Sequence, residues 1–259
     1  MTAGASPDHT SEATTLLGRH RRIWRDKAVL RAVYQDAYER ISARCPAGPV
    51  LEVGGGTGNL RHALQSTVPG PVISMDVQTA PWLDAAADAH RLPFADASFA
   101  AIVLFDVLHH LERPRLFLRE AARVLWPGGR LIMVEPAITP LSYPFYAWLH
   151  PEPVVMADDP LADGDLSPGR DPWHANQAYP TLLAGRHRRR LAEAVPDLRL
   201  DEVRRFALLA YPLSGGFQAW SLLPAGLTRP LLRLERALEG ALGRLMAFRM
   251  LMVMERARP

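Results

Sequence analysis

Short apolar runs alternate with helical patterns through the first half of the chain, and this alternation limits the possible folds more than any other feature. Nearly all-apolar strands that alternate with helices are typical of a parallel sheet covered on both faces. The connections between such strands should be right-handed crossovers. The expected strands are 49–53, 71–76, 82–87, 99–105 and 130–135, and the expected helices between them are 59–65 and 114–125.

Further segments precede and follow the part of the chain in which strands and helices alternate. A helical pattern over 11–43 precedes the first strand, and a stretch rich in Pro and Asp follows residue 136. A helix at 178–195 and strands at 198–210 and 248–255 bring the expected strand count to seven. We therefore expect a single domain of three segments, in which the third contains possible substrate lids at 137–177 and 211–243. The segments are an arm with N-terminal helices (1–44, the first 10–15 residues disordered), a core (45–136) and the rest of the sheet (137–259).

Composition excludes several other classes of protein. The 30 basic and 27 acidic side chains nearly cancel to a net charge of +3, which does not predict nucleic-acid binding. The single cysteine, Cys45, excludes an internal disulfide framework and a cysteine-based zinc cluster. Residues 1–15 lack the pattern of a secretory signal, and Pro and Gly interrupt the uncharged stretch 206–228. We expect a cytoplasmic protein without a membrane span, of unknown oligomeric state.

The loop after the first strand reads Glu-Val-Gly-Gly-Gly-Thr-Gly-Asn over 52–59. The dinucleotide pattern G-x-G-x-x-G fits Gly54 and Gly56 but fails at Asn59. An acidic-x-G-x-G-x-G pattern fits completely, from Glu52 to Gly58. Glycines let the backbone approach a ligand without a Cβ clash. A carboxylate beside the loop favours a cationic ligand over a phosphate, which is negatively charged. An ordinary strand-to-helix turn is the alternative.

Downstream blocks make the pattern specific. Asp76 ends the second expected strand, 24 positions after Glu52, where a carboxylate can accept hydrogen bonds from both hydroxyls of a ribose. The segment 87–94 reads Ala-Asp-Ala-His-Arg-Leu-Pro-Phe, and 123–131 reads Arg-Val-Leu-Trp-Pro-Gly-Gly-Arg-Leu. In this order, with the block 96–111, these segments resemble class I S-adenosylmethionine-dependent methyltransferases of the type 11 group that act on small molecules.

The resemblance implies a fold, a cofactor and a pocket. The fold is α/β, a Rossmann-like doubly wound and mostly parallel seven-stranded sheet with helices on both faces. The cofactor is S-adenosyl-L-methionine, with S-adenosyl-L-homocysteine as product; Asp76 would hold the ribose, and Asp88 and Ala89 the adenine. The gap between Asp76 and the next strand is too short for a crossover helix, so a loop is expected there. The implied cofactor-binding residues are Glu52, Gly54, Gly56, Gly58, Asp76, Val77, Asp88, Ala89 and Phe105.

Three residues near the ends of strands are candidates for catalysis. His109 and His110 could act as a general base or be structural histidines at a helix start. Glu135 ends the fifth strand, where it could face the substrate or cap the next turn. Lys27, the only lysine in the chain, or Arg31 could contact the cofactor's carboxylate, although both could equally be surface residues.

Two polar clusters have a less specific interpretation. Carboxylates and histidines between 150 and 174 could bind Mg²⁺ or Ca²⁺, but their spacing matches no defined metal loop, so we predict no metal. The run Arg186–Arg190 could clamp an anion, although a solvated helix face is more common.

Aromatic residues are frequent in the predicted lids. They could pack the lids onto the sheet or form the wall of a pocket for an apolar or aromatic acceptor. The expected function is methyl transfer to a small bacterial metabolite through an O, N or C nucleophile, without nucleic acid as substrate. An isomerase or cyclase on the same cofactor fold, or a non-catalytic cofactor-binding protein, are the alternatives.

Overall fold

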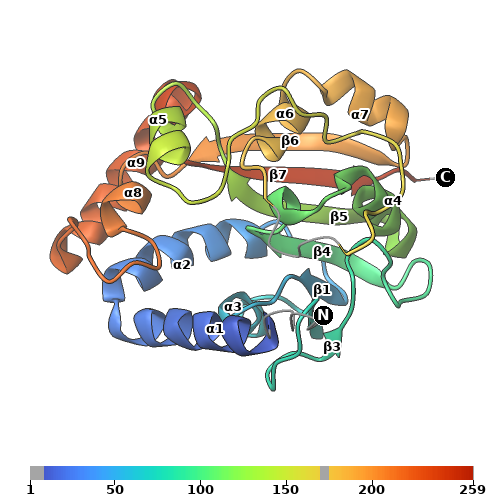
Figure 1. Ribbon diagram of the computed structural model, residues 1–259, viewed down its shortest axis with the longest axis horizontal. Helices are drawn as coiled ribbons and strands as arrows, with labels where there is room; N and C mark the ends of the chain where they lie inside the picture. Colours follow the sequence, from blue (N-terminus) through green and yellow to red (C-terminus); the bar gives the residue numbers. More distant parts are fainter. Residues whose placement is uncertain (1–8, 170–174, 259) are drawn as a thin grey trace, which may run out of the picture.

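The computed structural model describes residues 9–169 and 175–258, which fold around a seven-stranded sheet (Figure 1). Its strand order is β3-β2-β1-β4-β5-β7-β6. All neighbours pair in parallel except β7, which is antiparallel to both β5 and β6. The strands are β1 (Val50–Val53), β2 (Val72–Asp76), β3 (Ala85–Ala86), β4 (Phe99–Phe105), β5 (Leu125–Pro136), β6 (Leu198–Phe206) and β7 (Arg249–Arg256).

Helices cover both faces of this sheet because successive strand residues point to opposite sides. Leu51, Ile102 and Leu131 join an apolar core with α4, α6 and α7. Their neighbours Val50 and Val103 join a second core with α2 and α3. The doubly wound, mostly parallel architecture predicted from the sequence is therefore confirmed. The helices are α1 (His9–Asp26), α2 (Ala28–Ser42), α3 (Asn59–Gln65), the 3₁₀ turn η1 (Leu108–His110), α4 (Pro114–Val124), α5 (Ser142–Trp148), α6 (Tyr179–Ala184), α7 (Arg188–Ala194), α8 (Ala210–Ser214) and α9 (Ala225–Met246).

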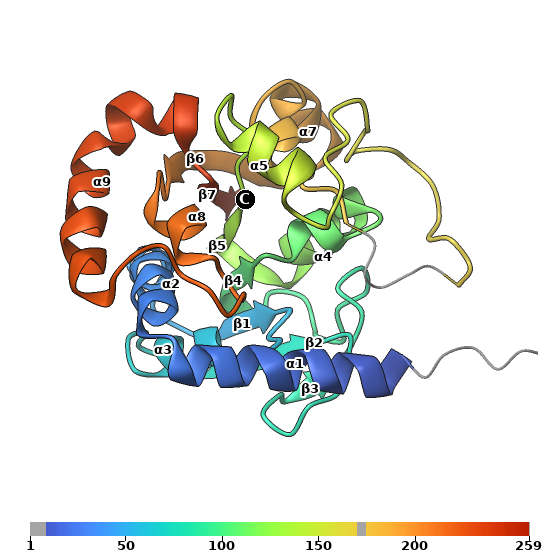
Figure 2. The same ribbon diagram turned by 60° about the vertical axis from the view of Figure 1, so that its left-hand side comes forward.

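The carboxyl ends of the parallel strands meet at one edge, which comes forward in Figure 2. Helix α1 runs along the bottom of that view, α8 lies to the left and α5 above. These three helices belong to the segments that the sequence adds to the alternating core. The additions therefore surround the edge at which open α/β sheets bind ligands.

Several predicted elements are shorter or divided. The helix expected over 11–43 breaks at Lys27, whose backbone is extended (φ −108°, ψ 91°). The helix expected over 178–195 divides at Gly185 into α6 and α7. The third strand has two residues, and residues 77–84 form the loop that we expected before it. The expected Pro-Gly-Gly turn at 127–129 lies inside β5, where the register with β4 shifts.

The predicted lids differ from each other in structure. The described part of 137–177 contains α5 and long loops, whereas residues 211–243 contain most of α8 and of the long helix α9. At the other end of the chain α1 begins at His9, and the preceding part of the predicted arm lies outside the described residues. None of the described helices combines the length and the apolar sequence needed to cross a bilayer.

Candidate active site

A cavity of about 820 Å³ opens at the carboxyl edge of the sheet. Its walls come from the loop after β1, the ends of β2 and β4, helix α1, the segment after α5 and the loop after α8. Gly58, one of the nine predicted cofactor residues, does not line it: a Cβ there would lie 2.9 Å from Cδ1 of Trp82, so this glycine serves packing. The other eight line the cavity: Glu52, Gly54, Gly56, Asp76, Val77, Asp88, Ala89 and Phe105.

Gly54 and Gly56 of the loop after β1 are glycines for different physical reasons. A Cβ on Gly54 (φ +75°) would lie 2.2 Å from Cγ2 of Val107, so close packing excludes a side chain there. At Gly56 (φ +43°) a Cβ would approach only the carbonyl oxygen of Gly54, at 3.9 Å. Because Gly56 lines the cavity, the space that its side chain would occupy is open to a ligand.

Two carboxyl groups lie beside this loop. Asp76 accepts hydrogen bonds from the amides of Gly56 (2.9 Å) and Gln78 (3.1 Å), which fix its carboxylate at the cavity wall. Glu52 is 2% exposed and accepts a 2.5 Å hydrogen bond from the Ser74 hydroxyl. Burial raises the pKa of Glu52 to about 7, so a bound cation would favour its ionised form.

On the adenine side predicted from the resemblance, Asp88 and Ala89 both line the cavity. The Asp88 carboxylate contacts the backbone amide of His90 at 2.9 Å and its Nδ1 at 2.7 Å. The open space at Gly56, the acids at Glu52 and Asp76 and this third carboxylate together fit a ligand with a cationic amino-acid end, a ribose and an adenine.

Further along the edge, Glu135 fixes the turn that follows β4. Its carboxylate is fully buried and accepts hydrogen bonds from the amides of Val107 (2.9 Å) and Leu108 (2.8 Å). Its other oxygen lies 2.6 Å from Nδ1 of His109. Neither Glu135 nor His109 lines the cavity. Of the two roles considered for Glu135, the structure therefore favours capping the next turn.

His110 is the histidine of the pair that reaches the cavity wall. The carboxylate of Glu152, also on that wall, lies 3.4 Å from Nε2 of His109 and 3.7 Å from Nε2 of His110. Nδ1 of His150 is 3.8 Å from the same carboxylate. One carboxylate thus gathers three imidazoles, and the predicted lid segment 137–177 supplies both His150 and Glu152.

The two adjacent histidines have opposite pKa shifts. Burial disfavours the charged form of His109, but the hydrogen bond and charge of Glu135, with Glu152, outweigh it and raise the pKa to about 10. Burial and the charge of His109 lower the pKa of His110. For Glu152, the histidines overcome the effect of burial and lower the pKa to about 2. At neutral pH His109 is therefore a fixed cation, whereas His110 is a neutral imidazole at the cavity.

The carboxylates of the stretch considered as a metal site each interact with a different partner. Asp158 accepts a hydrogen bond from Tyr179 (2.7 Å), Asp159 pairs with Arg190 (3.0 Å), and Asp163 pairs with Arg115. Asp171 and His174 lie outside the described residues. Among the described residues, the donors that lie close enough to share a cation are those of His109, His110 and Glu152, and those of Asp106, His109 and Glu135.

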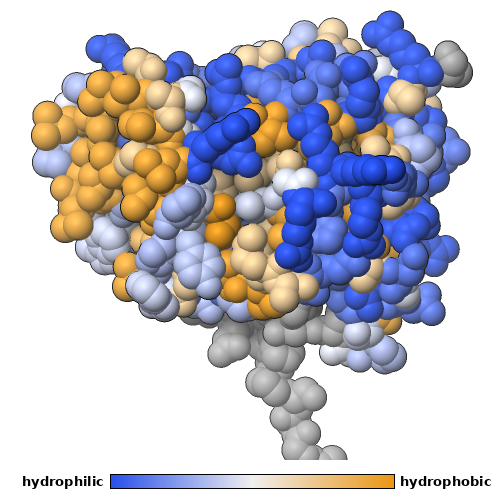
Figure 3. All heavy atoms as spheres, turned by 90° about the horizontal axis from the view of Figure 1, so that it is seen from above, coloured by the Kyte–Doolittle hydropathy of each residue, from blue (hydrophilic) through white to orange (hydrophobic). Residues whose placement is uncertain are grey.

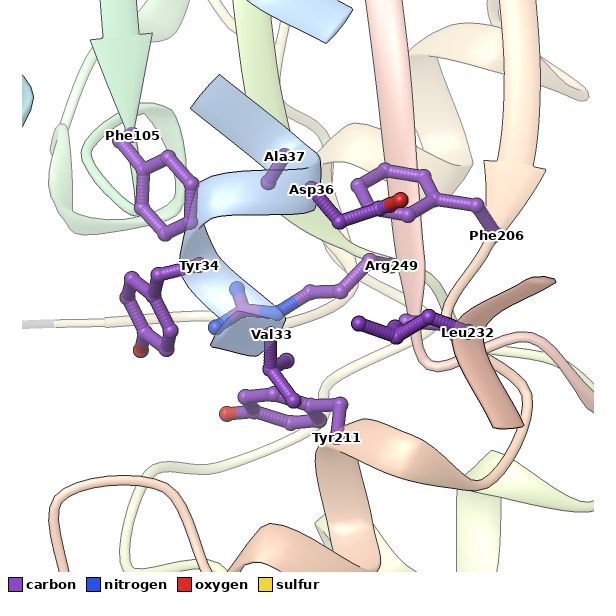
Figure 4. A pocket seen from close by; sticks show the side chains of 10 residues that line it. Val33, Tyr34, Asp36, Ala37, Phe105, Phe206, Tyr211, Leu232 and Arg249 are labelled. Atoms are coloured by element: carbon purple, nitrogen blue, oxygen red, sulfur yellow. The ribbon is translucent and has the colours of Figure 1, made fainter. Parts of the chain in front are cut away.

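A buried cation that no sequence pattern predicted lies behind the wall of the site. Arg249, at the start of β7, is 4% exposed and pairs through both of its terminal nitrogens with Asp106. Its guanidinium lies 4.2 Å from the ring centroid of Tyr211 (Figure 4). Asp106 has a left-handed backbone (φ +58°), which is uncommon for a residue other than glycine and is found at functional sites. In the sequence, the position of Asp106 directly after β4 was the feature that could have pointed to this site.

Tyrosines surround this ion pair. Tyr34 of α2 stacks on Phe105, with ring centroids 5.0 Å apart, and both line the cavity with Tyr38 and Tyr211. Burial raises the pKa of Tyr34 and of Tyr211. These phenols therefore remain neutral at physiological pH and can donate hydrogen bonds. Together they give one end of the cavity an aromatic wall.

Lys27 does not contact the cavity, contrary to one sequence hypothesis. Its ammonium donates hydrogen bonds to the carbonyl oxygens of Gly216 (2.8 Å), Gln218 (2.8 Å) and Trp220 (2.7 Å). Arg31 instead bonds the carbonyl oxygen of Trp24 (2.7 Å). Lys27 thus ties the break between α1 and α2 to the loop after α8, and this loop lines the cavity.

Comparisons with known proteins agree with this geometry. Residues 51–133 match the sequence model of the methyltransferase domain family. A probable S-adenosylmethionine-dependent methyltransferase of Mycobacterium tuberculosis is 36% identical over 119 residues, which cover 40% of this chain and 41% of the relative. A demethylmenaquinone methyltransferase of Tropheryma whipplei is 28% identical over 191 residues, or 64% of this chain and 79% of the relative.

The fold has solved counterparts. The Burkholderia thailandensis 1,6-didemethyltoxoflavin-N1-methyltransferase, solved with its acceptor and S-adenosylhomocysteine, superposes with a TM-score of 0.51 at 16% identity, covering 99% of this chain and 93% of its own. The fold and the site define a class I methyltransferase architecture. With the family match over residues 51–133, they show a methyltransferase domain in this chain that is similar to S-adenosylmethionine-dependent methyltransferases, and S-adenosylmethionine is the cofactor of this class.

Proposed function

We propose that this protein transfers a methyl group from S-adenosylmethionine to a small apolar or aromatic acceptor through an O, N or C nucleophile. The observation that carries the proposal is one continuous cavity. It joins the acids and open glycine of the β1–β2 side to an aromatic wall and a neutral histidine on the β4–β5 side. A biosynthetic role in the cytoplasm of a bacterium is part of the proposal.

The residues of the β1–β2 side would bind and orient the cofactor. Asp76 would accept hydrogen bonds from the ribose hydroxyls, and Gly56 leaves room for the chain beside them. Glu52 would act through its charge near the cationic amino-acid end. S-adenosylmethionine, when bound, supplies an electrophilic methyl group, so the protein need only position the acceptor and exclude water.

We assign to His110 the removal of a proton from a hydroxyl acceptor. It is a neutral imidazole at the cavity wall in the turn after β4, and a base must lie within reach of the proton that it abstracts. The proton would be taken at Nε2, where the Glu152 carboxylate stabilises the resulting imidazolium. His109 and Glu135, behind the wall, are positioning residues that hold Glu152 and the turn after β4.

The aromatic wall supports a flat or apolar acceptor. Tyr34, Tyr211 and Phe105 provide ring faces and neutral hydroxyl donors, a combination that suits a cyclic acceptor with a few polar atoms. The match with a demethylmenaquinone methyltransferase is consistent with an aromatic acceptor, which in this chain remains part of the proposal.

Calorimetry followed by a product assay tests the proposal. Purified protein should bind S-adenosylhomocysteine, and a panel of phenols, hydroxyquinones and aromatic amines should include acceptors that yield S-adenosylhomocysteine from S-adenosylmethionine. Absence of binding would refute the whole proposal. Binding without methylated product across the panel would favour an isomerase or cyclase, or a non-catalytic binding protein.

A divalent cation is a second candidate for the cluster around Glu152. The 3.4 Å between Nε2 of His109 and the Glu152 oxygen equals the separation of two ligands about 2.1 Å from one tetrahedral ion. We predict that no metal is needed, and chelation by EDTA should leave the rate unchanged. Loss of activity that Zn²⁺ or Mn²⁺ restores would replace the base assignment with a metal site.

A further inference from the structure

Helix α9 has a row of leucines that faces outward, although Leu231 and Leu232 of the same helix pack against the core. Leu227, Leu234, Leu238 and Leu245 are 38–57% exposed. Their spacing of seven, four and seven residues places them on one face of the helix. On the inner face, Glu235 is 3% exposed and accepts hydrogen bonds from three backbone amides at 208–210. A surface helix normally needs leucines only on the side that faces the core, so this additional exposed leucine face is suited to a partner.

A second apolar group continues from the end of this helix. The amide of Leu141 donates a 3.1 Å hydrogen bond to the carbonyl oxygen of Leu245, which joins α9 to the segment of α5. Around α5, Leu141, Trp148 and Leu149 are 53%, 78% and 76% exposed. Figure 3 shows apolar side chains gathered on this side of the molecule. Isolated exposed leucines are ordinary, but a continuous patch with an exposed tryptophan marks an interaction site.

Arginines border the leucine face. Arg229, Arg233 and Arg244 are exposed on α9, and none forms an ion pair within the described residues. Long arginine side chains can extend along an apolar surface while their charges reach anionic groups at its border. An apolar helical face with tryptophan nearby and arginines alongside has the composition of helices that lie in a membrane interface.

We propose that this leucine face and the adjoining α5 segment dock the protein onto the surface of an anionic phospholipid bilayer. The leucines and Trp148 enter the boundary of the acyl chains, and the three arginines contact phosphate groups. A second copy of this chain fits less well, because a two-fold interface across α9 brings the unpaired arginines of both copies together.

The docking face also borders the cavity. Leu149, which belongs to the docking face, lines the cavity and is 76% exposed. A docked molecule therefore opens its cavity towards the bilayer. If the proposed function also holds, on which this one step rests, an amphiphilic acceptor can enter the cavity from the membrane.

Vesicle sedimentation tests the docking without any methyl-transfer assay. The protein should co-sediment with vesicles of equal parts phosphatidylglycerol and phosphatidylcholine, and less with phosphatidylcholine alone. The double change Leu234→Ser and Leu238→Ser should weaken binding by roughly a hundredfold, about tenfold for each leucine. Removal of Arg229 and Arg233 as serines should weaken only the binding to the anionic vesicles.

Matched controls separate this result from misfolding and from failure of the proposed function. Trp126 is 38% exposed on β5 and does not belong to the docking face, so Trp126→Ser should sediment as the parent protein does. Each variant should keep the parent affinity for S-adenosylhomocysteine in calorimetry if that cofactor is bound at all. Absence of sedimentation at low salt would overturn the proposal. So would a dimer in analytical ultracentrifugation that the leucine changes dissociate.

Discussion

The two ends of the cavity are built in opposite ways. At the proposed cofactor end, residues between Glu52 and Ala89 line the wall. They lie at or directly after the ends of the consecutive strands β1, β2 and β3. At the acceptor end, the wall combines α2, the end of β4, the segment after α5 and the loop after α8. A ligand common to a family can thus be bound by local sequence, whereas a particular acceptor depends on distant segments that meet only in the folded chain.

The electrostatics of the two ends differ as well. The cofactor end has carboxyl groups, one of which, Glu52, has a pKa raised by burial. At the acceptor end, Arg249 pairs with Asp106, His109 lies between the carboxylates of Glu135 and Glu152, and His110 is neutral. The first end is suited to a cation, and the second to an acceptor whose proton is removed. Changes at the two ends should therefore affect different measurements.

The largest expected effect is on catalysis at the acceptor end. His110→Gln should lower kcat by roughly 100- to 10,000-fold with a hydroxyl acceptor, because a general base contributes about that much. The affinity for S-adenosylhomocysteine should not change. Since burial and His109 lower the pKa of His110, kcat of the parent should rise with pH through a value below 6.5 and then level off. The variant should lack this rise, and an unchanged pH profile would exclude His110 as the base.

At the cofactor end, Asp76→Ala should weaken S-adenosylhomocysteine binding by roughly 10- to 100-fold, since hydrogen bonds to a charged group contribute about 1.5–3 kcal/mol. Isothermal titration calorimetry measures the effect. Asp96→Ala is the matched control, because that carboxylate is exposed and pairs with Arg123 away from the cavity. Equal affinities of the two variants would remove Asp76 from the binding site.

Glu52 allows a test of stability against pH. Its pKa is raised from 4.5 to about 7 by folding, so the native state binds more protons than the unfolded state between these values. The free energy of unfolding should therefore fall as pH rises from about 4.5 to 7, by about 3 kcal/mol at most. Glu52→Gln should remove this component in urea titrations, yet weaken cofactor binding. A Glu52→Gln protein with the parent's pH dependence would contradict the assignment.

The smallest effect concerns the connection between the ends. Lys27→Met removes three hydrogen bonds to the loop after α8 and should lower the free energy of unfolding by about 1–2 kcal/mol. The loop should also become more sensitive to limited proteolysis near Gly216. Arg25→Met is the control, since Arg25 is exposed and its ion pair is with the adjacent Asp26. Equal cleavage rates in the two variants would show that Lys27 does not hold the loop.

Eight of the nine residues predicted to bind the cofactor line the cavity, because the sequence information for this end is local. A glycine loop and an acid at the end of the next strand follow from the order of elements, since parallel strands place their carboxyl ends together. The role of Gly58 was not predictable, because it depends on contact with Trp82 across the loop. The roles proposed for Asp76, Asp88 and Ala89 towards the ribose and adenine remain predictions.

For the acceptor end, the sequence indicated candidate residues but not the side chains with which they interact. His109, His110 and Glu135 were candidates, yet burial separates His110, at the cavity, from the other two. Arg249 and Asp106 are 143 residues apart, and no periodic pattern connects them. Lys27 attracted attention as the only lysine, but its three carbonyl partners lie about 190 residues away.

By itself, the sequence determined the doubly wound sheet and the class of cofactor, and it predicted the segment that is proposed to bind the cofactor. These depend on the period of apolar residues and on motifs whose members are close in the chain. The tertiary structure decided which histidine reaches the cavity, which cation lies behind it and which face of α9 is exposed. Those properties depend on burial and on charge pairs between distant segments, which exist only after the chain has packed.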